Sequence, residues 1–385
     1  MGRISETAER RAAPRVPLSV VPASPIAHAI IRPAAEAVAS LADEWSALAE
    51  RASEPNAFAE HWFVAAALRS MPAERDIKLI EARRGGRLIG VLPFEIVRFY
   101  ARLPVRVVQN WCHDHGFLGT PLVAAGEERA FWTAALAALN EADLPANLVH
   151  LWRMVEGGPV ARALGGAIVH RRIRAFLQSD LAPAAYYEQA VRQKKRKELR
   201  RLRNRLGDLG KVEARTLADR AGLDSWCDAF LALEQAGWKG KEGSALACTP
   251  EGAAFFREVV AAAWDEGRLQ FRRLDVEGRP VAMLVNFLCP PGGFSFKTAF
   301  DEGFGHYSPG VLLQIENLDL LDRPDIAWMD SCAAQDHPMI DSLWTERRPI
   351  VRITVPLDGW KRRTIWACCR ALELASARLR RRADV

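Results

Sequence analysis

A lysine lies in an apolar, strand-like run at the start of residues 294–313, which read FSFKTAFDEGFGHYSPGVLL. In a regular strand, Lys297 would face away from Phe294, Phe296 and Phe300, because successive side chains point to opposite faces. A lysine in such a run needs a counter-ion or an anionic ligand, because an unpaired buried charge is costly. Lys297 is therefore a candidate binding residue.

A helix start follows the loop at Ser308-Pro309-Gly310. Ser308 suits an N-cap and Pro309 suits the first helical position. Gly310 leaves the backbone open to close approach, and the unpaired amides of a helix start favour an anion. The segment predicts either a phosphate site or an ordinary capped helix.

Three side chains could transfer a proton to or from a reacting group. Asp330 lies in the apolar strand segment IAWMDSCA, His337 follows in QDHP, and Tyr307 precedes the helix start. A side chain with a pKa near the operating pH can act as a general base or acid. Each also has a structural interpretation: a carboxylate held by its neighbours, a helix-capping imidazole, and a tyrosine packed under the loop.

Two further segments carry candidate substrate-binding residues. Glu234 and Lys239 flank QAGW at a predicted helix end, and Trp238 is its last residue. These side chains either bind a charged substrate or are solvated. His113 and His115 lie in NWCHDHGF, where a zinc site would be cramped and has no matching second ligand pair. We expect a substrate-side loop there and no metal.

The composition indicates a globular protein of 385 residues, 49% of them hydrophobic. No apolar run approaches the roughly 18–20 residues that span a bilayer. The seven cysteines show no C-x-x-C spacing and their number is odd, which favours a reducing compartment, so we expect a cytoplasmic protein. Residues 1–32 lack the apolar core of a secretory signal and predict a disordered tail.

Basic residues are concentrated in residues 192–205, RQKKRKELRRLRNR, with nine basic residues and one acidic. The leucines at 199, 202, 206 and 209 predict a helix with one apolar stripe and an arginine-rich face. A solvated helix is the leading interpretation, and contact with phosphates of a cofactor, a nucleotide-linked glycan or tRNA is the second.

Residues 359–385 form a second basic amphipathic helix in this interpretation. Its apolar stripe would consist of Ile365, Cys368, Cys369, Leu372 and Leu379. The helix would pack on the preceding domain or lie on an anionic membrane surface.

An internal repeat organises the chain. Residues 77–94 align with residues 269–286 without a gap, so that Gly86-Arg87 matches Gly278-Arg279 at the turn of a predicted hairpin. Two helical patterns precede each hairpin, and strand, helix and strand follow it. The order predicts a mixed α/β protein built from a duplicated unit.

That order resembles a GNAT-type N-acyltransferase fold present twice. FLALEQAGWKGKEGSALA, KTAFDEGFGHYSPGVLL and DSCAAQDHPMIDSLWTERRP resemble the CelD-like branch, associated with bacterial exopolysaccharide synthesis, and Fem-type peptidyltransferases are more distant relatives. The resemblance implies tandem GNAT-like domains at residues 33–178 and 179–358, each with a mixed, mostly antiparallel sheet flanked by helices.

The resemblance also implies an acyl-CoA site, most simply for acetyl-CoA, in the second domain. It assigns Lys297, Thr298, Ala299 and Phe300 to the strand that lines the thioester, and Ser308, Gly310 and Val311 to the pyrophosphate loop. This chain departs from the usual Q/R-x-x-G-x-G/A pattern, because His306 and Tyr307 follow Gly303-Phe304-Gly305.

The implied reaction is acyl transfer from acyl-CoA to an amine, on an amino sugar or a polysaccharide precursor. Two alternatives stay open: an aminoacyl-tRNA-dependent transferase, and a non-catalytic scaffold or binding component of polysaccharide synthesis.

Overall fold

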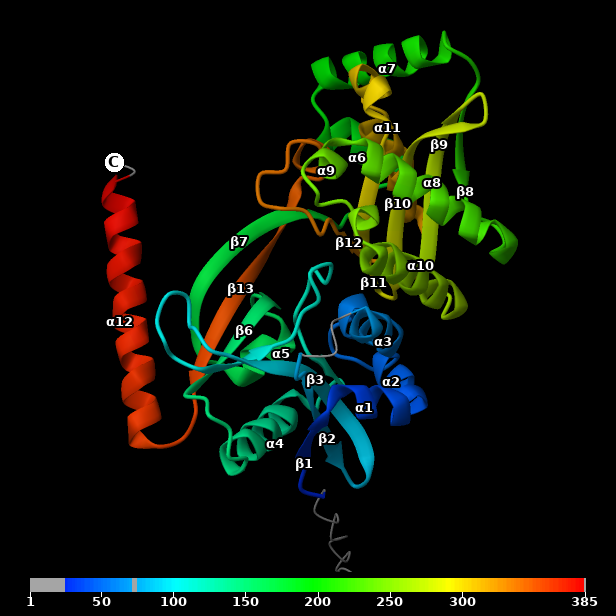
Figure 1. The fold of residues 1–385 in the computed structure, drawn as a ribbon. Coiled ribbons are helices and arrows are strands. Elements are labelled where there is room, and N and C mark those ends of the chain that lie inside the picture. Colours follow the sequence, from blue (N-terminus) through cyan, green and yellow to red (C-terminus); the bar gives the residue numbers. More distant parts are fainter. Residues whose placement is uncertain (1–24, 71–74, 384–385) are drawn as a thin grey trace, which may run out of the picture.

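The structure is a computed structural model that describes residues 25–70 and 75–383, with side chains to residue 376. Within these residues one continuous sheet of 13 strands is flanked by helices on both faces (Figure 1). The sheet is mostly antiparallel, and its strand order is β1-β2-β3-β4-β6-β13-β7-β12-β11-β10-β9-β8, with β5 beside β3. The predicted mixed α/β fold, with a mostly antiparallel sheet flanked by helices, is confirmed.

The first half of the chain runs from β1 to β7. Its elements are β1 (His28–Pro33), α1 (Ala34–Ser40), α2 (Ala42–Ala49), α3 (His61–Arg69), β2 (Lys78–Arg84), β3 (Arg87–Val97), β4 (Val107–Asn110), β5 (Leu122–Val123), α4 (Glu128–Glu141), β6 (Leu148–Val155), α5 (Pro159–Leu164) and β7 (Ala167–Leu177).

The second half repeats the main order, but it adds two helices at its start and one at its C-terminus, and it lacks counterparts of β5 and α5. Its elements are α6 (Pro183–Ala190), α7 (Gln193–Gly207), β8 (Val212–Thr216), α8 (Leu223–Ala236), α9 (Trp238–Lys241), α10 (Pro250–Asp265), β9 (Leu269–Val276), β10 (Arg279–Cys289), β11 (Gly292–Phe300), α11 (Pro309–Glu316), β12 (Trp328–Asp330), β13 (Glu346–Pro356) and α12 (Trp360–Ala383).

The two aligned hairpins have the same turn. In β2–β3 the turn residues Gly85 and Gly86 have φ of +55° and +81°, and in β9–β10 Glu277 and Gly278 have +50° and +77°. Positive φ at both central positions is the geometry of a two-residue hairpin, and glycine adopts it without strain. The predicted correspondence of the two hairpins is therefore confirmed.

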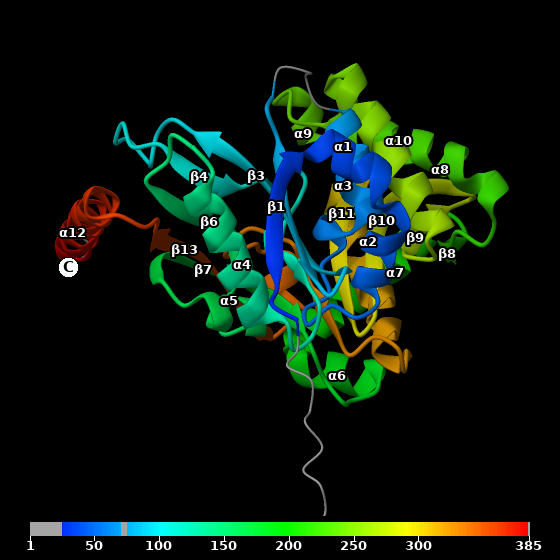
Figure 2. The same cartoon turned by 90° about the horizontal axis from the view of Figure 1, so that it is seen from below.

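Helices α1–α3, α8 and α10 share one apolar core, whereas α4 and α5 cover the opposite face of the first half (Figure 2). The alternation of side chains along β2 shows the two faces of the sheet. Leu79 belongs to the first core and Ile80 to the core on the opposite face, as expected for neighbours in a strand. Because α3 packs against α10, the halves meet helix to helix. In the second half α11 packs against β9, β10 and β11.

Each half contributes its final strand to the other half. Strand β7 pairs with β12, while β13 lies between β6 and β7 and pairs with both. By sequence β13 belongs to the second half, yet its neighbour β6 belongs to the first. We call this arrangement the strand exchange. Because of the strand exchange, the strands of both halves form a single sheet.

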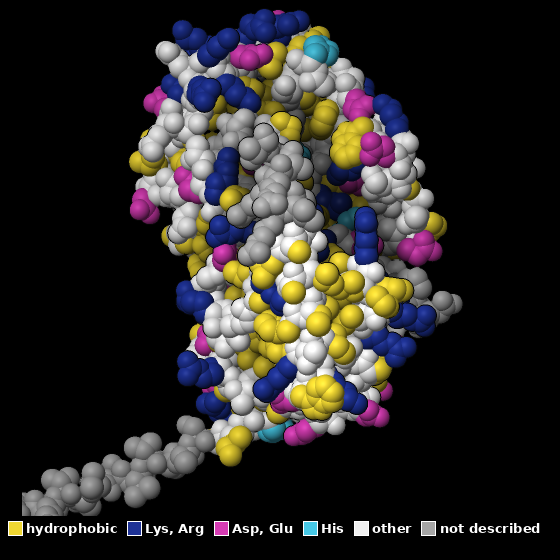
Figure 3. All heavy atoms as spheres, turned by 90° about the vertical axis from the view of Figure 1, so that its left-hand side faces the viewer, with side chains coloured by type: hydrophobic (Ala, Val, Ile, Leu, Met, Phe, Trp, Pro, Cys, Tyr) yellow, Lys and Arg dark blue, Asp and Glu magenta, His cyan; other side chains and the backbone are white. Residues whose placement is uncertain are grey.

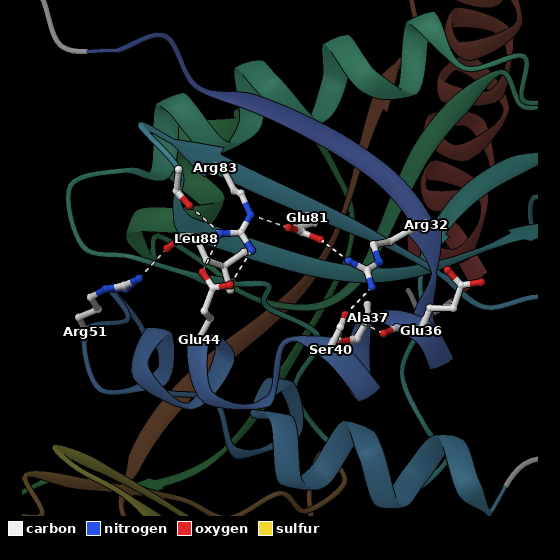
Figure 4. Close-up of polar contacts among 10 residues, drawn as sticks. Arg32, Glu36, Ala37, Ser40, Glu44, Arg51, Glu81, Arg83 and Leu88 are labelled. Atoms are coloured by element: carbon white, nitrogen blue, oxygen red, sulfur yellow. Dashed lines mark hydrogen bonds and ion pairs between the residues drawn. The ribbon is translucent and has the colours of Figure 1, made fainter.

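Ion pairs hold α2 against β2 and join β1 to β2, and Arg32 also bonds to Ser40 on α1 (Figure 4). Arg83 bonds to both Glu44 on α2 and the buried Glu81 on β2. Arg32 on β1 completes the row by donating to Glu81 at 3.0 Å. These contacts stabilise the first half of the chain and lie away from the candidate site.

The basic helix forms as predicted, except at its end. Leu199, Leu202 and Leu206 are buried, but α7 ends at Gly207, and Leu209 is half exposed. The predicted stripe was wrong at this last leucine because the chain leaves the helix before reaching it. Strand β1 begins at His28, inside the segment that the sequence assigns to the tail; residues 1–24 lie outside the described part.

The C-terminal helix packs on the first half through part of its predicted stripe. Cys369 is buried and Ile365 packs against it, whereas Cys368 is exposed and Leu372 is 52% exposed. The stripe is therefore narrower than predicted, and the side chain of Leu379 lies outside the described residues. No helix in the described residues is long and apolar enough to cross a membrane.

Candidate functional site

Polar residues from both halves meet where β11 faces α8. Lys297 on β11 and Glu234 and Lys239 at the end of α8 and on α9 come from the second half, and the loop after β4 brings His113 and His115 from the first. We call these five residues the junction cluster. The sequence singled out all five, and the structure brings them together.

A β-bulge sets the direction of Lys297. Along the β10–β11 ladder Val285 pairs with Lys297 and Asn286 pairs with Ser295, so Phe296 is left without a partner. Such an extra residue shifts the alternation of the strand. Lys297 therefore shares the α8 side with Phe296, whose ring centroid lies 5.8 Å from its ammonium. The expectation that Lys297 faces away from Phe296 was wrong for this reason.

One carboxylate serves two lysines in the junction cluster. Glu234 Oε1 lies 2.9 Å from Lys239 Nζ and 3.7 Å from Lys297 Nζ, and Glu234 Oε2 accepts the amide of Leu246 at 2.9 Å. Burial of Lys297 lowers its pKa to about 8, although Glu234 acts in the opposite direction. A lysine tuned to this range can exchange a proton near neutral pH.

The two histidines of the junction cluster are neutral at neutral pH. Burial lowers the pKa of His113 to about 4 and that of His115 to about 3, and Lys297 lowers both further. Their rings lie against Phe255 of α10, with centroids 4.2 and 5.7 Å away. His113 Nδ1 accepts the amide of His115 at 3.2 Å, which leaves its Nε2 to carry the proton. These imidazoles can bind a substrate without adding charge.

Sequence reasoning missed Arg153, which lies behind the histidine loop. It is in the middle of β6 with φ of +56°, and its guanidinium donates to the carbonyl of Gly116. A non-glycine residue held at positive φ is strained, and such residues concentrate at functional sites. No pattern in the sequence marks it, because a basic residue in an alternating strand reads as a solvated side chain.

Asp330 is buried inside an ion-pair network. It is 0% exposed, and its oxygens contact Arg174 Nε and Nη2 at 2.6 Å each and Arg348 Nη1 at 3.0 Å. The amide of Cys332 donates to it at 2.9 Å. With these partners neither oxygen is left for a substrate. The geometry supports the structural interpretation that the sequence left open, a clamp that joins β12 to β7 and β13.

Several amides of the loop and helix start at residues 301–312 bond within this segment. Asp301 accepts the amide of Gly303 at 2.9 Å, and the carbonyl of Ser308 accepts those of Val311 and Leu312 at 3.0 and 3.1 Å. A Cβ on Gly310 would meet the sulfur of Met339 at 3.5 Å. Met339 is therefore in ordinary van der Waals range of the helix start, and the carboxylate of Asp301 caps the turn before it.

The predicted cofactor strand lines only a small hollow. Thr298, Ala299 and Phe300 surround it together with Trp238, and its volume is about 30 Å³. A space of this size admits a water molecule and no nucleotide. Trp238 is 51% exposed beside it, so its ring is available to a ligand from solvent.

The remaining two proton-transfer candidates lie outside the junction cluster. Tyr307 is buried in a core with Leu206 of α7, and its ring centroid lies 3.9 Å from that of His306 with the two rings tilted by 43°, in keeping with a packing role. His337 is half-buried in the loop after β12, and its Nδ1 is buried without a partner among the described residues. In the described part of the chain no group of three His, Cys, Asp or Glu side chains is placed to hold a metal.

Comparison with known proteins finds a match in the second half of the chain. A family model described as an acetyltransferase (GNAT) domain matches residues 193–337. No curated protein matches the sequence.

Two solved structures share most of the architecture. FemX superposes with a TM-score of 0.54 at 10% identity, covering 80% of this chain and 94% of its own. The C-terminal domain of a protein assigned as lysylphosphatidylglycerol synthetase from Agrobacterium fabrum gives a TM-score of 0.51 at 11% identity, covering 88% and 96%. The second half of this chain is thus similar to a GNAT acetyltransferase domain, and the whole chain has a fold in common with these two proteins.

Proposed function

We propose that the protein transfers an acyl group to an amine at the junction cluster. The observation that carries the proposal is Lys297: a buried lysine with a pKa of about 8, set beside Glu234 at the meeting point of two GNAT-like halves. The matching acetyltransferase domain model covers this residue. Asp330 has no role in this chemistry.

Lys297 acts as the general base. An incoming amine must lose a proton as its nitrogen bonds to the acyl carbon, and a base with a pKa near the working pH accepts that proton most efficiently. The bond from the acyl carbon to the leaving group then breaks, and the leaving group takes up the proton that Lys297 returns. The reaction therefore needs no covalent intermediate on the protein.

The open edge of β11 suits the developing oxyanion. Strand β12 pairs with β11 only from Gly292 to Phe294, and beyond Phe294 the two strands diverge. The backbone amides of β11 on that side have no neighbouring strand. Amides already fixed in direction stabilise an oxyanion without reorganisation.

The donor we propose is an acyl thioester, in keeping with the matching acetyltransferase model, and the acceptor is an amino sugar or a related glycan precursor. Incubating the full chain with acetyl-CoA and glucosamine tests this directly. Mass spectrometry should detect N-acetylated product and an equal amount of free CoA. Absence of product with both acetyl-CoA and longer acyl-CoA species would reject the thioester.

The second candidate donor is an aminoacyl-tRNA. It is favoured by the carboxylate of Asp301 at the turn before the helix start, which disfavours a pyrophosphate there, and by α7, whose Lys and Arg residues are mostly exposed. Basic faces bind nucleic acid with strong salt dependence. Filter binding of bulk tRNA at 50 and 200 mM salt separates the candidates, because only this one predicts saturable binding that falls steeply with salt.

The pH profile should report the environment of Lys297. Because the neutral lysine is the base, the rate should rise with pH through about 8 and then level off. Glu234→Gln removes the anion that stabilises the charged lysine, so the pKa of Lys297 should fall and the midpoint should move down by about one pH unit. Glutamine can still accept the amide of Leu246.

Glu302→Gln is the matched control for that shift. Glu302 pairs with Lys241 and is 32% exposed, so its loss should leave the midpoint in place. A rate that falls as pH rises through 8 would instead show that Lys297 works as a cation.

A further inference from the structure

A large cavity lies beneath the C-terminal helix, away from the junction cluster. Its volume is about 1010 Å³, and it is bounded by α12, by β6, β7 and β13, and by the loop at residues 99–103. Figures 1 and 2 show α12 running beside β7 and β13 without packing flat against them. The volume is at the upper end of the range for small-molecule sites.

A buried imidazole lines this cavity with an unused donor. His150 is 5% exposed, and its Nδ1 accepts the indole N–H of Trp152 at 3.1 Å. The proton of the ring is therefore on Nε2, which is buried and has no partner among the described residues. Because an unsatisfied buried donor is costly, the position favours a ligand oxygen.

An arginine without a carboxylate partner stands beside that imidazole. Arg352 lies over the ring of Trp152 at 3.7 Å and forms no ion pair with the residues described. Burial is the main cause that lowers the pKa of Arg352, and the positive charges of Arg172 and Arg153 lower it as well. The three guanidinium groups therefore repel one another. An anion at this point would relieve that repulsion.

The basic surface continues out of the cavity. A smaller hollow shares Trp152, His170 and Arg352 with it, and a third shares Arg153 and Arg172 with the second. The charged end of a ligand can therefore sit at Arg352 while remaining in reach of solvent.

The other wall of the cavity is mainly apolar, although Arg102, Glu373 and Ser376 also line the cavity. Phe99, Leu103, Val169 and Leu372 line it, and Phe99 and Leu372 are more than half exposed. The helix surface seen from outside is also rich in hydrophobic side chains, with Lys and Arg around it (Figure 3). Exposed apolar side chains beside a basic, partly buried group favour a molecule with both characters.

We propose that this cavity binds an anionic amphiphile, a single alkyl or acyl chain that ends in a phosphate or a carboxylate. The head group lies against Arg352 and His150, and the chain lies between α12 and the sheet. This binding does not depend on the acyl transfer proposed above, because none of its residues belongs to the junction cluster.

Dodecyl phosphate below its micelle concentration is the probe, used with the full chain. Calorimetry should show saturable binding, and the fluorescence of Trp152 should change with it. Inorganic phosphate should bind at least about 100-fold more weakly, because it lacks the apolar chain. Dodecanol should bind about 10-fold more weakly, because it lacks the charge that pairs with Arg352.

Three variants locate the site. Arg352→Gln should weaken dodecyl phosphate about 10-fold and leave dodecanol unchanged. Val169→Trp should weaken both by filling the cavity, and Leu372→Gln, on a side chain already half exposed, should weaken both without affecting folding. Arg87→Gln, at an exposed hairpin turn, is the matched control with the same loss of charge and should bind like the unaltered chain.

Two outcomes would overturn the proposal: equal affinity for dodecyl phosphate and dodecanol, or dodecyl phosphate binding that all three variants retain. Absence of binding would also reject it. Flotation with phosphatidylglycerol vesicles identifies the source: co-flotation weakened by Arg352→Gln supports a membrane lipid, and binding of dodecyl phosphate alone supports a soluble one.

Discussion

Lys297→Met is expected to reduce the rate of acyl transfer by about 100- to 10,000-fold, the usual contribution of a general base. Methionine has nearly the same length and no proton to exchange. The side chain of Lys297 is only 9% exposed, and Glu234 keeps Lys239 and the amide of Leu246 as partners. We therefore expect the free energy of unfolding to change by less than about 1 kcal/mol. Steady-state rates and urea denaturation measure the two effects.

Lys239→Met is the matched control for that loss. It also removes an ammonium bound to Glu234, but from a side chain that is 27% exposed. Its effect on the rate should be far smaller, because it orients a charge and exchanges no proton. Similar losses in the two variants would mean that net positive charge, and not a base at Lys297, drives the reaction.

Asp330→Asn is expected to lower the free energy of unfolding by about 3–5 kcal/mol, the cost of removing one member of a buried ion pair. The substitution leaves the guanidinium groups of Arg174 and Arg348 buried without a counter-charge. Because Asp330 joins strands from both halves, the loss should appear in a single cooperative transition. Urea denaturation followed by circular dichroism gives the value.

Asp325→Asn is the matched control, because it removes a carboxylate from an ion pair on the surface instead of a buried one. Asp325 pairs with Arg323 at 2.6 Å, and both side chains are 42% exposed, so the loss should be about 0–1 kcal/mol. If Asp330→Asn instead kept its stability and lost turnover, Asp330 would return to the list of catalytic residues.

Local patterns in the sequence predicted much of this fold. The two hairpins were readable because glycine follows a polar residue or another glycine at a turn that requires positive φ. The basic helix was readable from the three-and-four spacing of Leu199, Leu202 and Leu206, all of which are buried. Such features depend on neighbours a few residues away, which a sequence displays.

The side of β11 on which Lys297 lies depends on one unpaired residue. Nothing in FSFKTAF marks Phe296 as the bulge, because its phenylalanine would suit a regular strand equally well. The bulge arises from the pairing with β10 and from the divergence of β12. Lys297 was therefore predictable as a candidate binding residue, but the residues that it contacts were not.

The helix start illustrates the same limit. Ser308, Pro309 and Gly310 form a helix N-terminus as their types predict, with Pro309 at the first position. What packs beside that N-terminus is decided by Met339, which is distant in sequence, whereas Asp301 caps the preceding 3-10 turn. The sequence analysis did not identify Arg174 and Arg348 as partners of Asp330. An arginine in a strand is expected to be exposed, and only the structure shows the buried carboxylate opposite it.

The strand exchange has a consequence for how this protein can be divided. A protease cut near residue 180 would leave two fragments still locked together, because each fragment's last strand is a middle strand of a sheet built mainly by the other. Expressed alone, either fragment would expose a bare strand edge that invites aggregation. Neither half can therefore be discarded, because the sheet of the other half would lose a central strand.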